Sequence, residues 1–496
     1  MKPVSGVPRL TVRLGGRELT PAEADALTSI RVRQALSVPA SCELSFSTPE
    51  ASLLDAAVSG ATLEVAVGEA GPLFAGDITA VESSWGGPRL RELRVRGYDP
   101  LHRLRKRQPV RAHAQVTTAG IARELAGDLG VEVVADRDSP VWPWLLQWKQ
   151  SDLDFLAELA GRTGLYLVFA GGVIRLLTLE GAGEPVPLVA GEGLTECEVE
   201  VNADRTCQTV EATGFDLVGV QPHRARVEGL PPGRPTARAL TSGRACALAD
   251  VASPTESHLE ATARAELLRR AATEVVLRGV AEGDPRLRPG VRVALSGVAA
   301  PLRGTYVLTS VDHVIDSRRG FLSSVSTASP DLPAPETGAG ATLAEVAQVD
   351  ATSGRVKVRL VAHGDVETDW LPIASAGAGV GKGLMALPDV GDHVLVLFHA
   401  SDAARGVVLA GLWSSSGPPD AGVKDGRVRR WALRSSGGHQ LELDDAKSAL
   451  RLGDSSGSFV EMTPRGVKLH AEVPLTIEAP GQPIVVLGDA VDFRRG

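Results

Sequence analysis

Cysteine, methionine and aromatic residues are scarce in this chain. Among its 496 residues there are 4 cysteines, 3 methionines and 3 tyrosines, and aromatic residues make up 4%. The cysteines are too few and too scattered for a disulfide framework or a CxxC metal knuckle; they are Cys42, Cys197, Cys207 and Cys246. This sparse usage indicates a reducing compartment rather than a disulfide-stabilised secreted domain.

Long apolar runs and targeting signals are missing as well. No window approaches the roughly 18 apolar residues that a membrane-spanning helix needs. Residues 1–30 contain arginines but neither an apolar segment nor a small-residue cleavage site, so no secretory signal is visible. We therefore expect a protein that leaves its cell only if another machine carries it.

The charge balance and the missing catalytic motifs exclude several functions. A net charge of -8 argues against a chain that binds nucleic acid over its whole length. The HExxH signature of one common hydrolase class is absent. The glycine-rich stretch 376–383 has Ala376 where a P-loop needs its first glycine, and Gly383 where it needs serine or threonine. We expect no catalytic residue and no cofactor.

Histidine and aspartate pairs near the end of the chain favour ordinary structural roles. His393 and His399 lie in one predicted strand at a separation of about 20 Å, which is too far for a shared metal ion, so we expect no metal site. Asp444 and Asp445 stand between two apolar alternations, which predicts a hairpin turn with exposed acids.

Glycine, proline and short apolar alternations are abundant. The 54 glycines and 32 prolines fit a turn-rich β protein, and the length suggests about three domains. We expect a mainly β, multidomain chain in which residues 1–330 form a strand-rich hub. Its strand-rich halves are predicted at about 1–100 and 200–330, with a mixed α/β insert at about 101–199.

Helix signals in the hub mark three sites. Ile121 and Leu125 share one helical face, and Gly130 is placed to end that helix. Capping boxes at Ser151 and Ser257 predict the starts of two more helices.

Residues 331–413 are predicted as a linker followed by a small barrel. Residues 331–340 are rich in proline and glycine and are typical of a linker. Residues 341–413 contain five or six short apolar alternations, including 370–371 and 384–387, which suit an OB-type barrel. Residues 414–426 are a second turn-rich linker.

The final segment, residues 427–496, cannot build a core of its own. Its short alternations predict consecutive strands, and one such ribbon would leave apolar faces in water and strand edges unpaired. We expect identical chains to wrap around one another as a triple-stranded β-helix needle, an intertwined prism. The predicted core positions of this trimer are Val467, Leu469, Leu475, Ile477, Ile484 and Val486.

Three groups of motifs follow one another along the chain. The first is Gly97-Tyr98-Asp99-Pro100-Leu101-His102-Arg103-Leu104 together with residues 150–156, and the second runs from Gly304-Thr305-Tyr306 to Val311-Asp312-His313. The third comprises Trp370-Leu371-Pro372, residues 388–396 and Gly411-Leu412-Trp413. In this order the chain resembles the central spike proteins of contractile injection systems: VgrG of type VI secretion, the hub and needle proteins of contractile phage baseplates, and the spikes of phage-tail-like extracellular particles.

The resemblance implies a structural homotrimer that crowns a hexameric inner tube and pierces a target envelope on firing. It implies baseplate proteins, a conical PAAR-type tip protein and effector cargo as partners, and no nucleic acid. It places assembly in the bacterial cytoplasm and the product in a contractile particle released or delivered outside the cell. The expected tip contacts are Leu487, Val491 and Phe493.

A basic run in the hub has two readings. It fits a solvated strand or loop face, or an electrostatic docking surface for an acidic tube or baseplate partner. Its residues are Arg103, Arg105, Lys106 and Arg107.

Two other functions stay open at this point. An OB-fold nucleic-acid-binding protein would need a basic, aromatic-rich barrel face, whereas residues 341–413 offer few aromatics. A peptidoglycan-degrading baseplate hydrolase would need a cleft with perturbed carboxylates.

Overall fold

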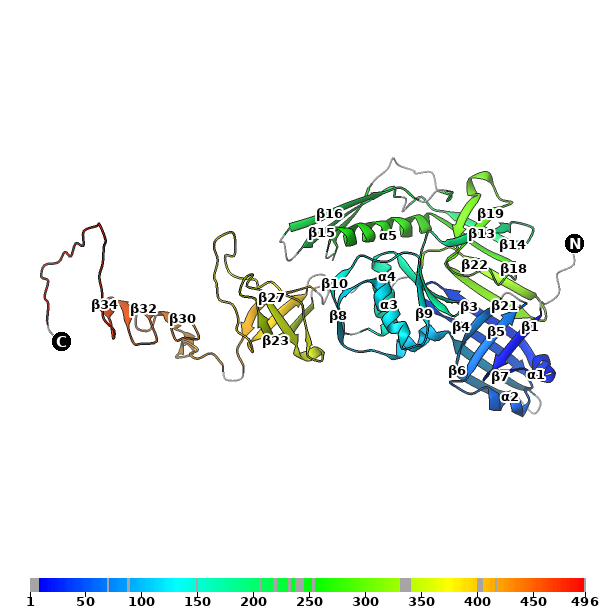
Figure 1. The fold of residues 1–496 in the computed structure, drawn as a ribbon, viewed down its shortest axis with the longest axis horizontal. Helices are drawn as coiled ribbons and strands as arrows, with labels where there is room; N and C mark the ends of the chain where they lie inside the picture. Colours follow the sequence, from blue (N-terminus) through cyan, green and yellow to red (C-terminus); the bar gives the residue numbers. More distant parts are fainter. Residues whose placement is uncertain are drawn as a thin grey trace. The chain divides into compact units, whose positions relative to one another are not determined.

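The computed structural model describes residues 9–68, 71–86, 90–148, 150–204, 207–216, 221–230, 233–236, 245–251, 255–330, 340–398, 405–414 and 417–494. The chain separates into two compact units, Met1–Gly411 (unit 1) and Leu412–Gly496 (unit 2). Strands predominate over helices, as the ribbon in Figure 1 shows, so the predicted mainly β, multidomain fold class is confirmed. The predicted 331–340 linker lies almost wholly outside the described residues.

One 11-stranded sheet joins the two ends of the hub region. Strands from the first hundred residues and strands from 194–326 meet where β3 pairs with β21, with Ile30 opposite Ile315. The order is β14 (Leu194–Val201), β18 (Val275–Glu282), β22 (Gly320–Ser326), β21 (Ser310–Asp316), β3 (Leu27–Ala35), β4 (Val38–Ser47), β7 (Leu90–Tyr98), β6 (Pro72–Gly86), β5 (Thr62–Val67), β1 (Leu10–Leu14) and β2 (Arg17–Glu18).

The alternation of side chains explains why this sheet is buried on one face. In β4, Cys42, Leu44 and Phe46 are buried in a core cluster, while Glu43 between them forms an ion pair with Arg96 of β7. Two short helices, α1 (Pro21–Ala26) and α2 (Ala51–Ala56), lie beside this part of the sheet. The strands predicted at 10–14, 42–46, 63–67 and 93–95 are confirmed.

The predicted mixed α/β insert contains its own apolar cluster. Leu125 of α3 and Leu156 of α4 are fully buried there, together with Leu167 of β11. Ser151 is the N-cap of α4, as predicted, and accepts a hydrogen bond from the backbone of Asp154. The elements are η1 (Pro100–Lys106), β8 (Arg111–Val116), α3 (Thr118–Gly127), β9 (Glu132–Ala135), β10 (Trp142–Gln147), α4 (Asp152–Arg162), β11 (Leu165–Ala170) and β12 (Val173–Thr178).

Two three-stranded sheets complete the hub region. One consists of β13 (Ala182–Val189), β19 (Val291–Ser296) and β20 (Gly304–Val307), and the other of β16 (Gln221–Glu228), β15 (Thr209–Asp216) and β17 (Ala245–Val251). Helix α5 (Glu256–Glu274) runs beside β15 and β16 (Figure 1) and shares a core cluster with their sheet.

Helix α5 begins two residues earlier than the sequence predicts. The N-cap of α5 is Thr255, which accepts a hydrogen bond from the backbone of His258, so the predicted start at Ser257 is wrong by two residues. Serine and threonine stand at both positions, and sequence alone does not say which one closes the helix. Among the described residues, no helix is long and apolar enough to cross a membrane.

A five-stranded sheet closes unit 1. Its order is β25 (Val366–Glu367), β24 (Val356–Leu360), β23 (Gly340–Val349), β26 (His393–Phe398) and β27 (Gly406–Leu412). Val346, Val358 and Val396 are fully buried in one cluster, which also includes Leu146 of β10. Residues 384–387 form no strand, contrary to prediction, and residues 370–371 contribute only an isolated bridge, Val356 to Leu371. The apolar side chains of residues 384–387 are exposed on a loop, so the alternation in this stretch does not come from a strand.

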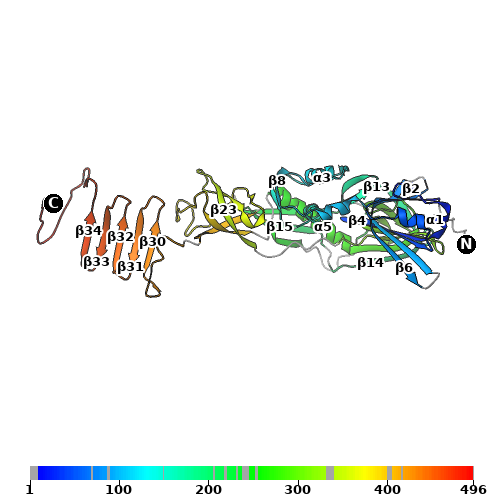
Figure 2. The same ribbon diagram turned by 90° about the horizontal axis from the view of Figure 1, so that it is seen from below.

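Unit 2 is an antiparallel ribbon, shown in Figure 2. A short hairpin of β28 (Val423–Lys424) and β29 (Arg427–Val428) precedes five strands that pair in chain order. These are β30 (Arg430–Arg434), β31 (Gln440–Asp444), β32 (Ala449–Gly453), β33 (Phe459–Thr463) and β34 (Gly466–His470). The turn predicted at Asp444–Asp445 is confirmed, but Asp444 is buried rather than exposed, and it accepts the backbone N–H of Lys447.

Candidate interaction surfaces

Apolar side chains gather on one face of the five-stranded ribbon in unit 2. Residues directly opposite each other in neighbouring antiparallel strands point to the same face. The register therefore places Trp431, Leu443, Leu450, Met462 and Val467 in one row across the ribbon. A second row on that face is Leu433, Leu441, Leu452, Val460 and Leu469. We call these ten residues the apolar face.

The apolar face is open to solvent in the single chain. Trp431 is 69% exposed, Leu452 57% and Val467 71%. Within the described part of unit 2, no apolar side chain is buried, and none of the core clusters includes a residue of this unit. A contiguous apolar patch of this kind marks an interaction surface in a soluble protein.

The opposite face of the same ribbon is charged and polar. Register places Glu442, Arg451, Glu461 and Lys468 in one row across four strands. Arg451 Nη1 lies 3.8 Å from Glu461 Oε1, and the guanidinium of Arg451 stacks 3.9 Å from the ring centre of Phe459. Opposite charges in a cross-strand row support the strand pairing and suit a face that stays in water. The ribbon is thus strongly two-sided.

The remaining predicted needle residues lie beyond the last strand. Residues 471–494 form no strand within the single chain, where the sequence predicted several. Of the predicted trimer core, Val467 and Leu469 belong to β34, while Leu475, Ile477, Ile484 and Val486 are exposed beyond it. The predicted tip contacts are also exposed: Leu487 by 90%, Val491 by 52% and Phe493 by 92%. Both residue assignments remain predictions.

In the hub, the motif at residues 97–104 joins the large sheet to the insert. Gly97 is needed because a Cβ there would lie 2.8 Å from the carbonyl oxygen of Asp77 on β6. Asp99 caps η1 by accepting the N–H of Leu101 at 3.0 Å, and it also accepts the N–H of Ala40 at 2.8 Å. Burial raises the pKa of Asp99 to about 7 against the opposing effect of these two hydrogen bonds. This motif therefore has a structural explanation.

Two arginines of the basic run are held by acids of the same chain. Arg103 donates to both carboxylate oxygens of Asp77 at 2.7 Å, and this contact is the main cause that holds the pKa of Asp77 below its usual value. Arg107 Nε lies 2.6 Å from Asp152 Oδ2, and Asp152 also accepts from Arg111 at 2.7 Å. Asp152 is itself 1% exposed. These two acids neutralise part of the predicted docking surface.

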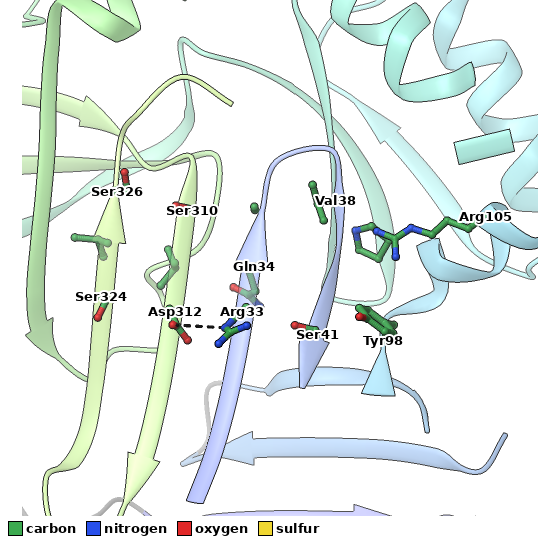
Figure 3. A pocket seen from close by; sticks show the side chains of 14 residues that line it. Arg33, Gln34, Val38, Ser41, Tyr98, Arg105, Ser310, Asp312, Ser324 and Ser326 are labelled. Atoms are coloured by element: carbon green, nitrogen blue, oxygen red, sulfur yellow. Dashed lines mark ion pairs between the residues drawn. The ribbon is translucent and has the colours of Figure 1, made fainter. Parts of the chain in front are cut away.

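Arg105 differs from its neighbours in the run because it faces a pocket. Its guanidinium lies 5.6 Å from the ring centre of Tyr98, and both line a cavity of about 500 Å³ with Arg33. Figure 3 shows Arg33 and Asp312 on adjacent strands of this pocket, where Arg33 Nε lies 3.8 Å from Asp312 Oδ2. Asp312 is already bound by Arg31 at 2.9 and 3.0 Å. Among the three arginines of the run, Arg105 is thus the one best placed to meet an acidic group, and the docking assignment remains a prediction.

The glycine-rich loop of the barrel folds back on itself. Gly379 and Lys382 exchange backbone hydrogen bonds of 3.0 and 3.1 Å, which closes a tight turn through Gly381 at φ +69°. Their N–H groups are therefore used within the loop rather than aimed at a phosphate. Phe398 is buried in the barrel core and unavailable for base stacking. His393 is exposed on β26, and His399 lies outside the described residues.

Sequence reasoning missed Asp77 and Asp152 as partners of the basic run. Each lies on a different element from the arginine it binds, 26 residues from Arg103 and 45 from Arg107. A local clue existed for Asp152, because it stands in the first turn of a helix whose cap was predicted. No comparable clue marked Asp77.

Family comparisons agree with this arrangement. Residues 33–318 match the phage tail baseplate hub (GPD) family, and residues 342–413 match the type VI secretion system/phage-baseplate injector OB domain. The second match confirms the predicted OB-type barrel. No curated protein sequence matches the chain significantly.

Solved structures share the fold at low sequence identity. An Escherichia coli component of the type VI secretion system, described as similar to the T4 bacteriophage tail proteins gp27 and gp5, aligns with a TM-score of 0.53 at 14% identity. That alignment covers 78% of this chain and 96% of the other. A chain from a Francisella PdpA–VgrG complex aligns with a TM-score of 0.55 at 9% identity, covering 93% of this chain and 87% of the other.

Proposed function

This chain belongs to the phage tail baseplate hub family, and from that premise we propose that it is the homotrimeric central spike of a contractile injection system. In this role it crowns the inner tube and is driven through a target envelope when the sheath contracts. The role is mechanical, and its requirement is a rod that keeps its shape under axial load.

The apolar face of unit 2 carries this proposal. Unit 1 contains several buried apolar clusters, whereas the described part of unit 2 buries no apolar side chain and presents ten on one side of a ribbon. Covering a large apolar side chain stabilises an assembly by about 1.5–3 kcal/mol. Other copies of the same chain are always present in the stoichiometry needed to cover it.

A threefold arrangement accounts for both faces of the ribbon. Three ribbons with their apolar faces turned inward enclose a dry axis and leave the Glu442–Arg451–Glu461–Lys468 row in water. The number three comes from the resemblance to trimeric spikes, since two ribbons packed face to face would also cover the apolar residues. Pairing across three chains would also extend the strands beyond His470 and remove free edges.

The proposal is tested by substitutions on the two faces of the ribbon. Leu443→Asp with Leu452→Asp places two charges on the proposed axis, so we expect the trimer to be lost because buried unpaired charges are strongly unfavourable. The matched control is Arg451→Gln with Glu461→Gln, which changes the opposite face of the ribbon on β32 and β33 and should leave the trimer intact. Light scattering behind a sizing column reports the subunit count for each. Equal subunit counts for the two variants would contradict the proposal.

We further propose that the end of the needle seats a conical tip protein. Leu487 and Phe493 are about nine-tenths exposed, although such large apolar side chains are normally covered. Deleting the residues after Gly481 should abolish co-purification of the tip protein while the trimer persists. Unchanged co-purification would refute the tip contact and leave the trimer proposal untouched.

For the hub, we propose that Arg105 contributes to docking on an acidic tube or baseplate partner. Arg103 and Arg107 are held by Asp77 and Asp152, so their substitution would disturb the fold. Arg105→Glu is therefore the informative variant, with an expected loss of binding to the tube at low salt. Binding equal to the parent chain at low salt would exclude this contact.

A further inference from the structure

The cavity beside Arg105 lies where the two halves of the large sheet meet. Figure 3 shows strands of both halves side by side at this pocket, with β21 and β22 next to β3 and β4. Register places five residues in one row across β22, β21, β3, β4 and β7, which we call the pocket row: Ser324, Asp312, Arg33, Ser41 and Tyr98. The pocket therefore forms only when the two halves of the sheet have joined.

Small side chains explain why the sheet is hollowed at this point. Register places a second row beside the pocket row on the same face, and it consists of Ser326, Ser310, Ala35 and Val38. These side chains do not fill the space above the sheet. The cavity of about 500 Å³ that results falls within the range of about 300–1,000 Å³ typical of ligand pockets. A pocket of this size accepts a short segment of a partner.

The pocket has a surplus of positive charge. Its one acid, Asp312, accepts from Arg31 Nε at 2.9 and 3.0 Å, whereas Arg33 Nε lies 3.8 Å away from it. Among the described residues this is the only ion pair of Arg33, and Arg105 makes none. The carboxyl of Asp99, on which the charge of Arg105 acts, is 2% exposed and accepts backbone N–H groups. Arg33 and Arg105 are therefore the two groups that can bind an anion here.

The spacing of these two arginines matches a pair of carboxylates. Arg105 lies over the ring of Tyr98, at one end of the pocket row, and Tyr98 is two strands away from Arg33. Because neighbouring strands are about 4.8 Å apart, the two positions are separated by about 10 Å. In an extended chain, residues two to four positions apart are separated by about 7–14 Å. Two acids at such a spacing can therefore reach both guanidinium groups, which bind carboxylates through parallel hydrogen bonds.

We propose that this pocket binds a short, extended acidic segment of a partner protein, with Arg33 and Arg105 each holding one carboxylate. The hydroxyl groups of Ser41 and Tyr98 stand between them in the pocket row and can donate further hydrogen bonds. This inference deepens the docking role proposed for Arg105, and it rests on the spike role only for the identity of the protein that carries the segment. Binding of the segment itself is a property of the single chain.

A nucleic acid fits this face less well than an acidic protein segment. Its phosphates form a continuous line of negative charge. The neighbouring row on the same face places Glu43 opposite both Arg31 and Arg96, so a line of phosphates would meet a like charge there. The ring of Tyr98 already carries the guanidinium of Arg105, which leaves less of it for base stacking. A segment with two carboxylates needs only the pocket.

Fluorescence anisotropy of a labelled peptide tests the proposal on the full chain. The probe is a peptide with blocked ends and two glutamates separated by two glycines, and the control peptide has glutamines in their place. At low salt we expect the glutamate peptide to bind at least about tenfold more tightly, because charge-assisted hydrogen bonds are stronger than neutral ones. Equal affinities for the two peptides would overturn the proposal.

Substitutions locate the site on the chain. Arg33→Gln and Arg105→Gln should each weaken binding of the glutamate peptide about tenfold. Arg94→Gln is the matched control, because it removes the same charge from the same face of β7 outside the pocket, and the affinity should stay within about twofold. An equal loss in Arg94→Gln and Arg33→Gln would indicate a general charge effect and overturn the pocket.

Filling the pocket separates its shape from its charge. Ser41→Phe places a ring between the two arginines without changing either of them, so binding of the glutamate peptide should be lost. Circular dichroism checks that this variant keeps the parent fold. Parent-like affinity in a folded Ser41→Phe chain would contradict the assignment of the pocket.

Two further results distinguish this inference from its neighbours. A labelled single-stranded oligonucleotide that binds more tightly than the glutamate peptide, and loses affinity in Arg33→Gln, would overturn the acidic segment in favour of nucleic acid. If the peptide binds as expected while Arg105→Glu leaves docking on the tube unchanged, the pocket is supported, and only the tube as its partner is excluded.

Discussion

Unit 1 and unit 2 are both built mainly from paired strands with alternating side chains, yet they differ in whether the apolar side chains are buried. In β4 of unit 1 the alternation turns Cys42, Leu44 and Phe46 into a closed core. In β32 of unit 2 the same alternation leaves Leu450 39% and Leu452 57% exposed. An alternating pattern therefore predicts a strand with one apolar face. It does not indicate whether that face is buried by the same chain or by another one.

The difference lies in what surrounds each sheet. Unit 1 places short helices, a mixed insert and further sheets beside its large sheet, so that each apolar face meets another element of the same chain. Unit 2 has only consecutive hairpins, and a meander cannot fold back on its own apolar face without additional layers. We propose that other copies of the chain cover that face.

A pair of matched truncations would sharpen the contrast most strongly. Leu44→Ala removes a fully buried side chain of unit 1 and should lower the free energy of unfolding of that unit by about 2–5 kcal/mol. Leu469→Ala, on the apolar face of unit 2, should leave the unfolding of unit 1 unchanged and weaken subunit association instead. Urea unfolding followed by circular dichroism, at two protein concentrations, separates the two effects. If Leu469→Ala lowered the free energy of unfolding by the same amount at both protein concentrations, the proposed difference between the two units would be contradicted.

Polar groups inside unit 1 should be as sensitive as its apolar core. Asp152 is buried and binds both Arg107 and Arg111, so Asp152→Asn removes two charge-assisted contacts at once. We expect a loss of about 3 kcal/mol in the stability of unit 1. Arg451→Gln, which changes a half-buried surface pair in unit 2, should cost about 1 kcal/mol or less. Equal urea midpoints for Asp152→Asn and the parent chain would contradict this stabilising role of Asp152.

Acid should weaken unit 1 through a buried histidine. His313 is fully buried between Ser323 and the carbonyl of Leu287, with Arg288, Asp284 and Asp312 nearby, and burial lowers its pKa to about 4. Because the unfolded chain binds the proton near pH 6.5, the stability from neutral His313 is present above that pH and is lost as the pH falls towards 4.

The size of this effect is measurable before most carboxylates titrate; Asp99, whose pKa is raised to about 7, contributes equally to the variant and the parent chain. Between pH 6.5 and 5 we expect His313 to account for a loss of about 2 kcal/mol. His313→Gln should remove that share of the pH dependence, as read from urea midpoints at the two pH values. A variant whose midpoint shifts with pH as much as the parent's would exclude this role.

Local signals in the sequence predicted much of the fold. Alternation placed the strands at 42–46 and 394–398, and Ser151 marked the start of α4 because a cap needs only its next three residues. Failures occurred where two local solutions compete. Thr255 caps α5 although Ser257 offers the same chemistry, and residues 384–387 alternate without any strand to pair with.

Contacts between distant residues could not be read from one sequence. Arg31 and Asp312 are 281 residues apart and meet only because β3 pairs with β21. The same holds for Arg103 with Asp77. The ten-residue apolar face required the strand register as well, since alternation alone does not say which residues of neighbouring strands share a row.

Sedimentation equilibrium of the unmodified full chain tests the central claim most directly. The account predicts one species of about 155 kDa, three times the 51.8 kDa of a single chain, that persists on dilution. A stable, protease-resistant species of 51.8 kDa at the same concentrations would contradict it, because ten apolar side chains of unit 2 would then remain in water without a partner.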